Sequence, residues 1–152
     1  MFSKYKSYII QILIALAVGG LSALAVMGNF SVYDEVIKPA LAPPPIVFPI
    51  VWSILYILMG ISSGIVHKTE SRVPFIYWLQ LFVNFLWPII FFNMQAYLFA
   101  LIWLVLLWVL IIAMIVEFYK INKIAAFLQI PYLLWATFAA YLNFFIWLYS
   151  RY

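Results

Sequence analysis

The chain has 152 residues, of which 70% are hydrophobic and 8% are charged. This composition excludes a soluble globular protein, because such a protein needs a polar surface to face water. The net charge of +4 is not gathered in a basic stripe or a nucleic-acid-binding motif, so we expect no nucleic-acid partner. The absence of cysteine excludes disulfides, thiolate chemistry and cysteine-ligated metal centres.

Five apolar stretches, each long enough to cross a bilayer, take up nearly the whole chain. They are apolar on every side and lack the alternation of barrel strands, so they predict membrane-spanning helices. The first stretch follows Lys4 and Lys6 but has no convincing cleavage site, so we interpret it as a retained helix rather than a signal peptide. The sequence therefore predicts an all-α integral membrane protein, a five-transmembrane-helix bundle forming a single membrane domain over residues 1–152, with spans at about 6–27, 46–66, 74–92, 97–119 and 123–149.

The one long connection between spans, residues 28–45, differs in composition from the rest of the chain. It contains the charged residues Asp34, Glu35 and Lys38. Proline restricts φ and removes a hydrogen-bond donor, so the segment is expected to be stiff and partly extended across one mouth of the bundle. Its prolines are Pro39, Pro43, Pro44 and Pro45.

Lysine and arginine are distributed unequally between the two faces that five spans define. One face carries six lysines and arginines and the other carries two. This excess favours a cytoplasmic location for the first face, with the N-terminus inside and the proline-rich loop outside. A short chain with this bias suits a bacterial plasma membrane. The first face carries Lys4, Lys6, Lys68, Arg72, Lys120 and Lys123, and the second carries Lys38 and Arg151.

Polar and aromatic residues recur at helical spacing in three of the spans. Spacings of three and four place such residues on one face of a helix. Three such faces predict a cavity with flat aromatic walls and a few hydrogen-bonding groups, which suits a planar apolar ligand. The alternative is that these stripes serve helix packing or the membrane interface. The stripes are Trp52, Tyr56 and Gly60 in the second span, Gln80, Asn84, Trp87 and Phe91 in the third, and Trp135, Ala139, Leu142 and Asn143 in the fifth.

Candidate catalytic groups are scarce. The single histidine, His67, stands beside Lys68 at the end of the second span, where an interfacial role is favoured over ligation of an iron. Asp34 and Glu35 are adjacent in a loop, so their side chains are expected to diverge rather than form an acid/base pair. We find no nucleophile and base arrangement, phosphate-binding loop or metal-ligand spacing, which argues against a hydrolase, a kinase or a resident metal.

Small residues indicate where helices approach closely. Ala15, Gly19 and Ala23 recur every four residues in the first span, and Gly60 and Gly64 form a GxxxG pair in the second. Such faces allow a close helix neighbour in a membrane. Within a five-helix bundle, packing inside the chain is the favoured use.

Three ordered blocks resemble the TspO/MBR family, the tryptophan-rich sensory proteins and the mitochondrial translocator protein. The first is Lys38-Pro39, Ala42-Pro43-Pro44 and the run from Val47 to Ser62, the second runs from Asn84 to Phe92, and the third from Pro131 to Trp147. The resemblance implies a five-helix bundle, often a homodimer, with a pocket beneath the first loop that binds porphyrins such as protoporphyrin IX. By matching positions, it implies the ligand-binding residues Pro43, Trp52, Tyr56, Asn84, Trp87, Phe91, Trp135, Ala139 and Leu142.

Two functions follow as hypotheses. The leading one is a membrane receptor or carrier that binds a planar tetrapyrrole for sensing, buffering or transport, with the bilayer as its environment and no required cofactor. The alternative, also implied by the resemblance, is light-dependent degradation of bound porphyrin, with Trp52 and Trp135 as redox partners of the excited macrocycle. A scaffold acting through a partner protein is a third class, for which the sequence identifies no partner.

Overall fold

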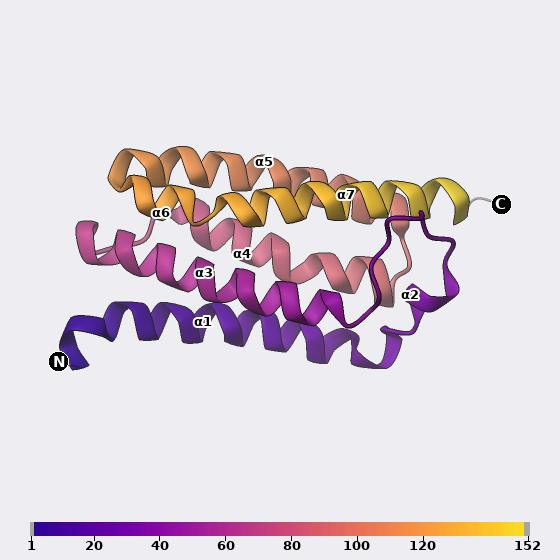
Figure 1. Ribbon diagram of the computed structural model, residues 1–152, viewed down its shortest axis with the longest axis horizontal. Coiled ribbons are helices and arrows are strands. Elements are labelled where there is room, and N and C mark those ends of the chain that lie inside the picture. Colours follow the sequence, from indigo (N-terminus) through magenta and orange to yellow (C-terminus); the bar gives the residue numbers. More distant parts are fainter. Residues whose placement is uncertain (1, 151–152) are drawn as a thin grey trace.

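The computed structural model describes residues 2–150 and is a bundle of long helices lying side by side (Figure 1). Within this part of the chain, five spans are long and apolar enough to cross a membrane, so the predicted five-helix membrane bundle is confirmed. The long helices are α1 (Phe2–Val26), α3 (Val47–Glu70), α4 (Phe75–Pro88), α5 (Tyr97–Ile121) and α7 (Ile130–Ser150). The short elements are η1 (Met27–Asn29), α2 (Val32–Glu35), η2 (Ile89–Asn93) and α6 (Lys123–Phe127).

The helices differ from the predicted span bounds by up to four residues at their ends, and two of the differences have a local cause in the sequence. Helix α3 continues past position 66 to Glu70, and it ends where Ser71 takes a left-handed conformation with φ 62° and donates its N–H to the His67 carbonyl. The predicted span 123–149 is divided into α6 and α7. Pro131 has no N–H to donate back to the preceding turn, which explains why the helix is interrupted just before it.

Helices α1 and α3 approach each other closely through glycine. A Cβ atom at Gly60 would collide with the backbone of Ile12, and one at Gly64 would lie 3.0 Å from the Cα of Tyr8. Gly19 of α1 makes room for the ring of Tyr56 of α3. The expectation that these small residues serve packing within the chain is therefore met for this pair of helices.

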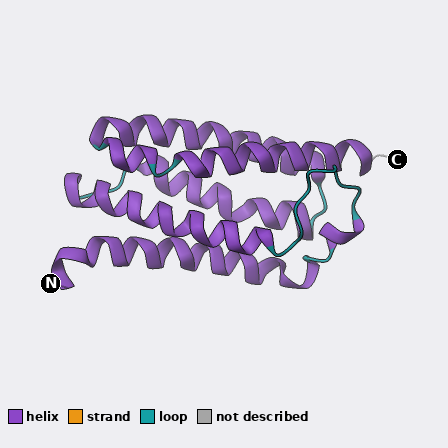
Figure 2. Ribbon diagram, in the orientation of Figure 1, coloured by secondary structure: helices purple, strands orange, loops and turns teal. Residues whose placement is uncertain are grey.

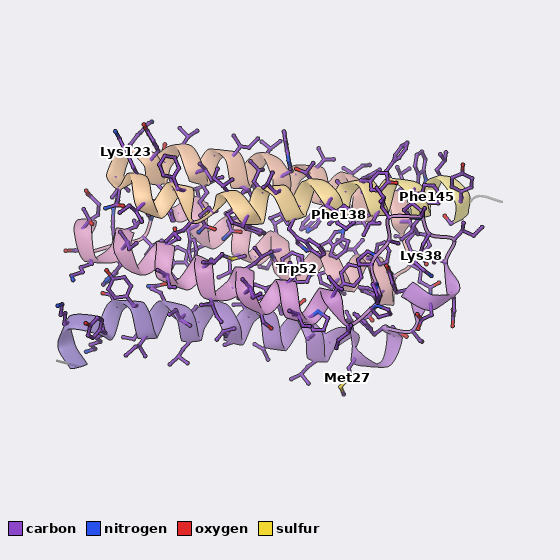
Figure 3. The ribbon with its side chains drawn as sticks, in the orientation of Figure 1. Met27, Lys38, Trp52, Lys123, Phe138 and Phe145 are labelled. Carbon is purple, nitrogen blue, oxygen red and sulfur yellow. The ribbon has the colours of Figure 1, made fainter. Side chains whose placement is uncertain are left out.

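The loop that joins α1 to α3 crosses one end of the bundle. Figure 2 shows this segment running over the ends of the helices, at the opposite end from the N-terminus. Lys38 in this loop and Lys123 at the start of α6 lie at opposite ends of the molecule (Figure 3). Arg151, which the sequence assigns to the loop face, is outside the described residues.

Candidate functional site

A small cavity lies beneath the loop, at the end of the bundle where α7, η2 and the start of α3 meet. Its volume is about 40 Å³. Aromatic rings and aliphatic side chains form most of its wall, and none of its lining residues is charged. The lining residues are Tyr33, Phe48, Trp87, Phe91, Phe92, Ala139, Leu142, Asn143 and Ile146.

A change of helix type places two adjacent aromatic rings on this cavity. Helix α4 ends at Pro88, and the next turn, η2, is a π-helix in which Met94 donates its N–H to the Ile89 carbonyl at 3.1 Å. Such wide turns are rare and often occur at functional sites. Both Phe91 and Phe92 therefore reach the cavity, with their ring centroids 4.9 Å apart and their planes at 67°.

Tyr33 of α2 forms the roof of the cavity and is held by polar contacts within the loop. Its hydroxyl donates to the Pro43 carbonyl at 2.7 Å, and the Lys38 ammonium donates to the Tyr33 carbonyl at 2.7 Å while lying 4.9 Å from the Tyr33 ring centroid. Burial, with a smaller contribution from the Asp34 carboxylate, raises the pKa of the Tyr33 phenol. The phenol therefore stays protonated and keeps its hydrogen bond to Pro43.

Asn143 of α7 is the amide that reaches the cavity. Its Oδ1 accepts from the indole Nε1 of Trp87 at 3.1 Å, and its Nδ2 donates to the Tyr97 carbonyl at 2.9 Å. The side chain is buried, with 1% of its surface exposed. Asn143 therefore joins α7 to α4 and to the first residue of α5, and fixes the Trp87 ring as a wall.

A second amide, Asn84 of α4, belongs to a buried chain of side chains that does not line the cavity. The Tyr56 hydroxyl donates to Asn84 Oδ1 at 2.7 Å, and Asn84 Nδ2 donates to the Tyr132 hydroxyl at 2.7 Å. Tyr132 in turn donates to Gln80 Oε1 at 2.8 Å. The chain links α3, α4 and α7 in the interior.

Comparison with known proteins identifies the family. The sequence profile of the TspO/MBR family matches residues 11–148. The chain belongs to the TspO/MBR family. It is 40% identical over 118 residues to the tryptophan-rich protein TspO of Chlorobaculum tepidum, with 74% of this chain and 75% of that protein covered. It is 39% identical over 121 residues to protein CrtK of Rhodobacter capsulatus, with 76% of each covered.

The similarity extends to animal proteins. The chain is 38% identical over 122 residues to the translocator protein of Homo sapiens, with 76% of this chain and 72% of that protein covered. The resemblance stated from the residues is thus confirmed, and membership of the TspO/MBR family supports a role as a membrane receptor or transporter.

The structure brings four of the nine predicted site residues to the cavity of this TspO/MBR protein: Trp87, Phe91, Ala139 and Leu142. Trp135 does not line the cavity but packs against Phe48, which does; the centroids of the two rings are 5.7 Å apart. Trp52 packs against Tyr56 and Tyr132, and Pro43 contributes the carbonyl that holds Tyr33. The ligand-binding role of all nine residues stays a prediction.

Sequence reasoning did not select five of the lining residues. Asn143 belongs to the fifth-span stripe, four positions after Ala139, but the matching positions of the family resemblance include Asn84 and not Asn143. Ile146 follows at the next helical spacing on the same face. Tyr33 and Phe48 come from the loop and its junction with α3, where no periodicity guides a prediction, and Phe92 reaches the cavity because η2 is a π-helix.

The single histidine lies at the other end of the bundle. His67 Nδ1 is 3.0 Å from the Ser7 hydroxyl of α1, within hydrogen-bonding distance. Glu117 and Lys120, at the same end, form an exposed ion pair at 3.5 Å. Both contacts lie at the end of the bundle opposite the cavity.

Proposed function

We propose that this protein is a membrane receptor or carrier that binds a planar tetrapyrrole, such as protoporphyrin IX, beneath the first loop, for sensing, buffering or transport. The observation that carries the proposal is the cavity wall. Five aromatic side chains face it, and they come from the loop, α3, α4 and η2. Aromatic faces stack on a planar macrocycle, and an uncharged wall suits a ligand that dissolves in the bilayer.

The cavity must open before such a ligand enters. Ligand sites usually enclose about 300–1,000 Å³, far more than the 40 Å³ found here. We expect the loop to be the element that moves, because it covers the cavity through the edge contact of the Tyr33 ring with Phe48, while the hydrogen bond between Tyr33 and Pro43 keeps the loop's own shape. A bound macrocycle would replace these ring contacts with its own.

A larger side chain in the cavity wall tests the proposal. Ala139 lines the cavity, whereas Ala140, the next residue, does not. With the protein in lipid nanodiscs, Ala139→Val should weaken protoporphyrin IX binding about tenfold, since added bulk competes with the ligand, while Ala140→Val should leave the affinity within about twofold. Quenching of tryptophan fluorescence measures both. Equal affinities in the two variants would place the ligand elsewhere.

The alternative function, light-dependent porphyrin degradation, depends on tryptophans close to the ligand. One contact favours it: Trp135 touches Phe48, which lines the cavity. Illumination of the protein with protoporphyrin IX separates the two functions. Loss of the porphyrin spectrum with a defined product, abolished by Trp135→Phe or Trp52→Phe, supports degradation, whereas a stable spectrum supports binding alone.

We also propose a bacterial plasma membrane location with a cytoplasmic N-terminus. The six lysines and arginines at the end opposite the loop support this orientation. Ser31 and Ser71 are exposed at opposite ends, and the chain has no cysteine of its own. A cysteine at position 31 should react with an impermeant thiol reagent in intact spheroplasts, and one at position 71 only after lysis. The reverse result would invert the orientation.

The family resemblance further supports a homodimer as the assembly. Native mass spectrometry of the protein released from nanodiscs measures this directly. A dominant mass of two chains is the expected result, and a single-chain mass at all lipid-to-protein ratios would contradict it.

A further inference from the structure

We propose that Asn143 is the polar recognition residue of the cavity, the group that selects ligands carrying a carbonyl oxygen on an apolar planar body. The assignment rests on the proposed function, because it concerns the same cavity. It moves the polar role from Asn84, the amide that the sequence favoured, to an amide on a different helix.

The orientation of the Asn143 amide is fixed by its two partners. The indole N–H of Trp87 can only donate, so the atom facing it at 3.1 Å must be the side-chain oxygen. The Tyr97 carbonyl can only accept, so the atom facing it at 2.9 Å must be the side-chain nitrogen. Rotating the amide by half a turn would break both bonds. Asn143 therefore presents a constant pattern of donor and acceptor to the cavity.

Asn143 retains hydrogen-bonding capacity after making these two bonds. An amide has two N–H donors and an oxygen with two lone pairs, and each group is used once here. The other polar side chains that line the cavity use their donors elsewhere: Tyr33 donates to Pro43, and Trp87 donates to Asn143 itself. Asn143 is 1% exposed in the closed cavity, so its second N–H becomes the side-chain donor that the described wall offers to a ligand once the cavity opens.

Asn84 differs from Asn143 in both location and partners. Both amides are buried, but Asn143 lines the cavity and Asn84 does not. Both its partners, Tyr56 and Tyr132, are hydroxyls, which can donate or accept. Its amide can therefore reverse if both hydroxyls, and the Gln80 amide that accepts from Tyr132, reverse with it. An amide bonded to two hydroxyls can turn and offer either a donor or an acceptor to a ligand. An amide held by one donor and one acceptor cannot turn, so it discriminates between ligands more strongly.

The chemistry of the wall narrows the class of ligand. No charged side chain lines the cavity, so a buried carboxylate would lack a counter-charge there, and the carboxylates of protoporphyrin IX would have to stay outside this wall in water. A neutral ester, amide or ketone oxygen can accept the free N–H of Asn143 without that cost. The polar edge selected by this residue is therefore a neutral carbonyl group.

A pair of neutral porphyrins tests the assignment. Protoporphyrin IX dimethyl ester carries ester carbonyls, whereas etioporphyrin carries alkyl groups alone. In nanodiscs of one composition, Asn143→Leu should lower the affinity for the ester about tenfold, the effect of one lost hydrogen bond in an apolar site, and change that for etioporphyrin less than twofold. The matched variant Asn84→Leu should not alter the ratio of the two affinities.

The outcomes separate this assignment from the proposed function. An equal loss for both porphyrins in Asn143→Leu would mean that Asn143 only holds Trp87 in place, and would overturn the assignment. No saturable binding of either porphyrin by the unchanged protein would overturn the proposed function and the assignment with it. If Asn143→Leu does not fold, Asn143→Ala takes its place, because alanine has no side-chain donor to offer. A preserved preference for the ester in Asn143→Ala would also overturn the assignment.

Discussion

The two ends of the bundle interior are filled differently. Toward the N-terminal end, glycine lets α1 and α3 touch backbone to backbone, and aliphatic side chains such as Met59, Ile111 and Met114 are fully buried. Beneath the loop, rings fill the space and leave a cavity. We refer to the first region as the packed half and to the second as the loop cluster, whose buried members are Val26, Val32, Tyr33, Ile90, Phe91, Phe92, Ala100 and Ile146.

This difference suggests a division of labour between stability and ligand access. Separating close-packed helices costs much free energy, because their short contacts are lost and the dispersion energy of those contacts is not replaced. Rings held by single hydrogen bonds and edge contacts can move, as around Tyr33. Trp87 packs against both regions, so it is a ring through which movement of the loop cluster would reach the packed half.

The largest effect is expected where the packed half has no room. In Gly60→Ala, the added Cβ meets the backbone of Ile12, which cannot move aside as a side chain would. We expect destabilisation of about 3 kcal/mol. In the matched variant Gly20→Ala, the Cβ meets nothing within 4 Å, so stability should rise by up to about 1 kcal/mol through helix propensity.

Reversible unfolding of the protein in mixed micelles by a denaturing detergent measures both glycine variants. A similar stability for the two would show that α1 and α3 are not in close contact, and would remove the distinction between the packed half and the loop cluster.

A smaller effect is expected from single hydroxyl groups in the buried polar chain. Tyr132 and Tyr77 are both buried, but the Tyr132 hydroxyl bonds to Asn84 and Gln80, whereas the Tyr77 hydroxyl makes no hydrogen bond of good geometry among the described residues and only approaches the Ser63 hydroxyl. Tyr132→Phe should therefore destabilise the protein by about 2 kcal/mol, because it leaves two amides short of a partner. Tyr77→Phe should cost almost nothing. Equal losses in the same unfolding assay would contradict the hydrogen-bond chain.

Much of the fold was predictable because it depends on composition and period. The five spans follow from apolar length alone, and the residues Trp87, Phe91, Ala139 and Leu142 follow from helical spacing. Helical spacing states which face a residue occupies, but not what lies opposite it at that depth. Asn84 and Asn143 both satisfy the spacing rule, and only their different neighbours separate them.

The rest of the cavity depends on irregular backbone, which periodicity does not describe. Tyr33 reaches the cavity through the path of the loop, which is fixed by contacts between residues such as Tyr33 and Pro43. Phe92 reaches it because the chain after Pro88 forms a π-helix, and a single sequence gives no rule for where such a turn begins. The break between α6 and α7 was predictable in principle from Pro131.

The smallest predicted effect concerns the hold of the loop on the cavity. Tyr33→Phe keeps the ring that forms the roof and removes the 2.7 Å hydrogen bond to the Pro43 carbonyl. One such bond contributes about 1 kcal/mol, so protoporphyrin IX should dissociate about fivefold faster if loop opening limits release. The association rate should change less, because changes within one site act mainly on dissociation. Tyr149→Phe, at an exposed position on α7, is the control and should change neither rate.

Stopped-flow displacement in nanodiscs measures these rates, and Tyr33→Phe is a sharper probe than replacing the loop prolines. The carbonyls of Pro44 and Pro45 accept the N–H groups of Val47 and Phe48 at the start of α3. Glycine would keep these carbonyls but free the restricted φ angles that position them, so it would also disturb that helix. An unchanged dissociation rate in folded Tyr33→Phe would mean that the loop does not limit release. The ligand would then leave between helices into the lipid. The loop cluster would line the site without controlling release of the ligand.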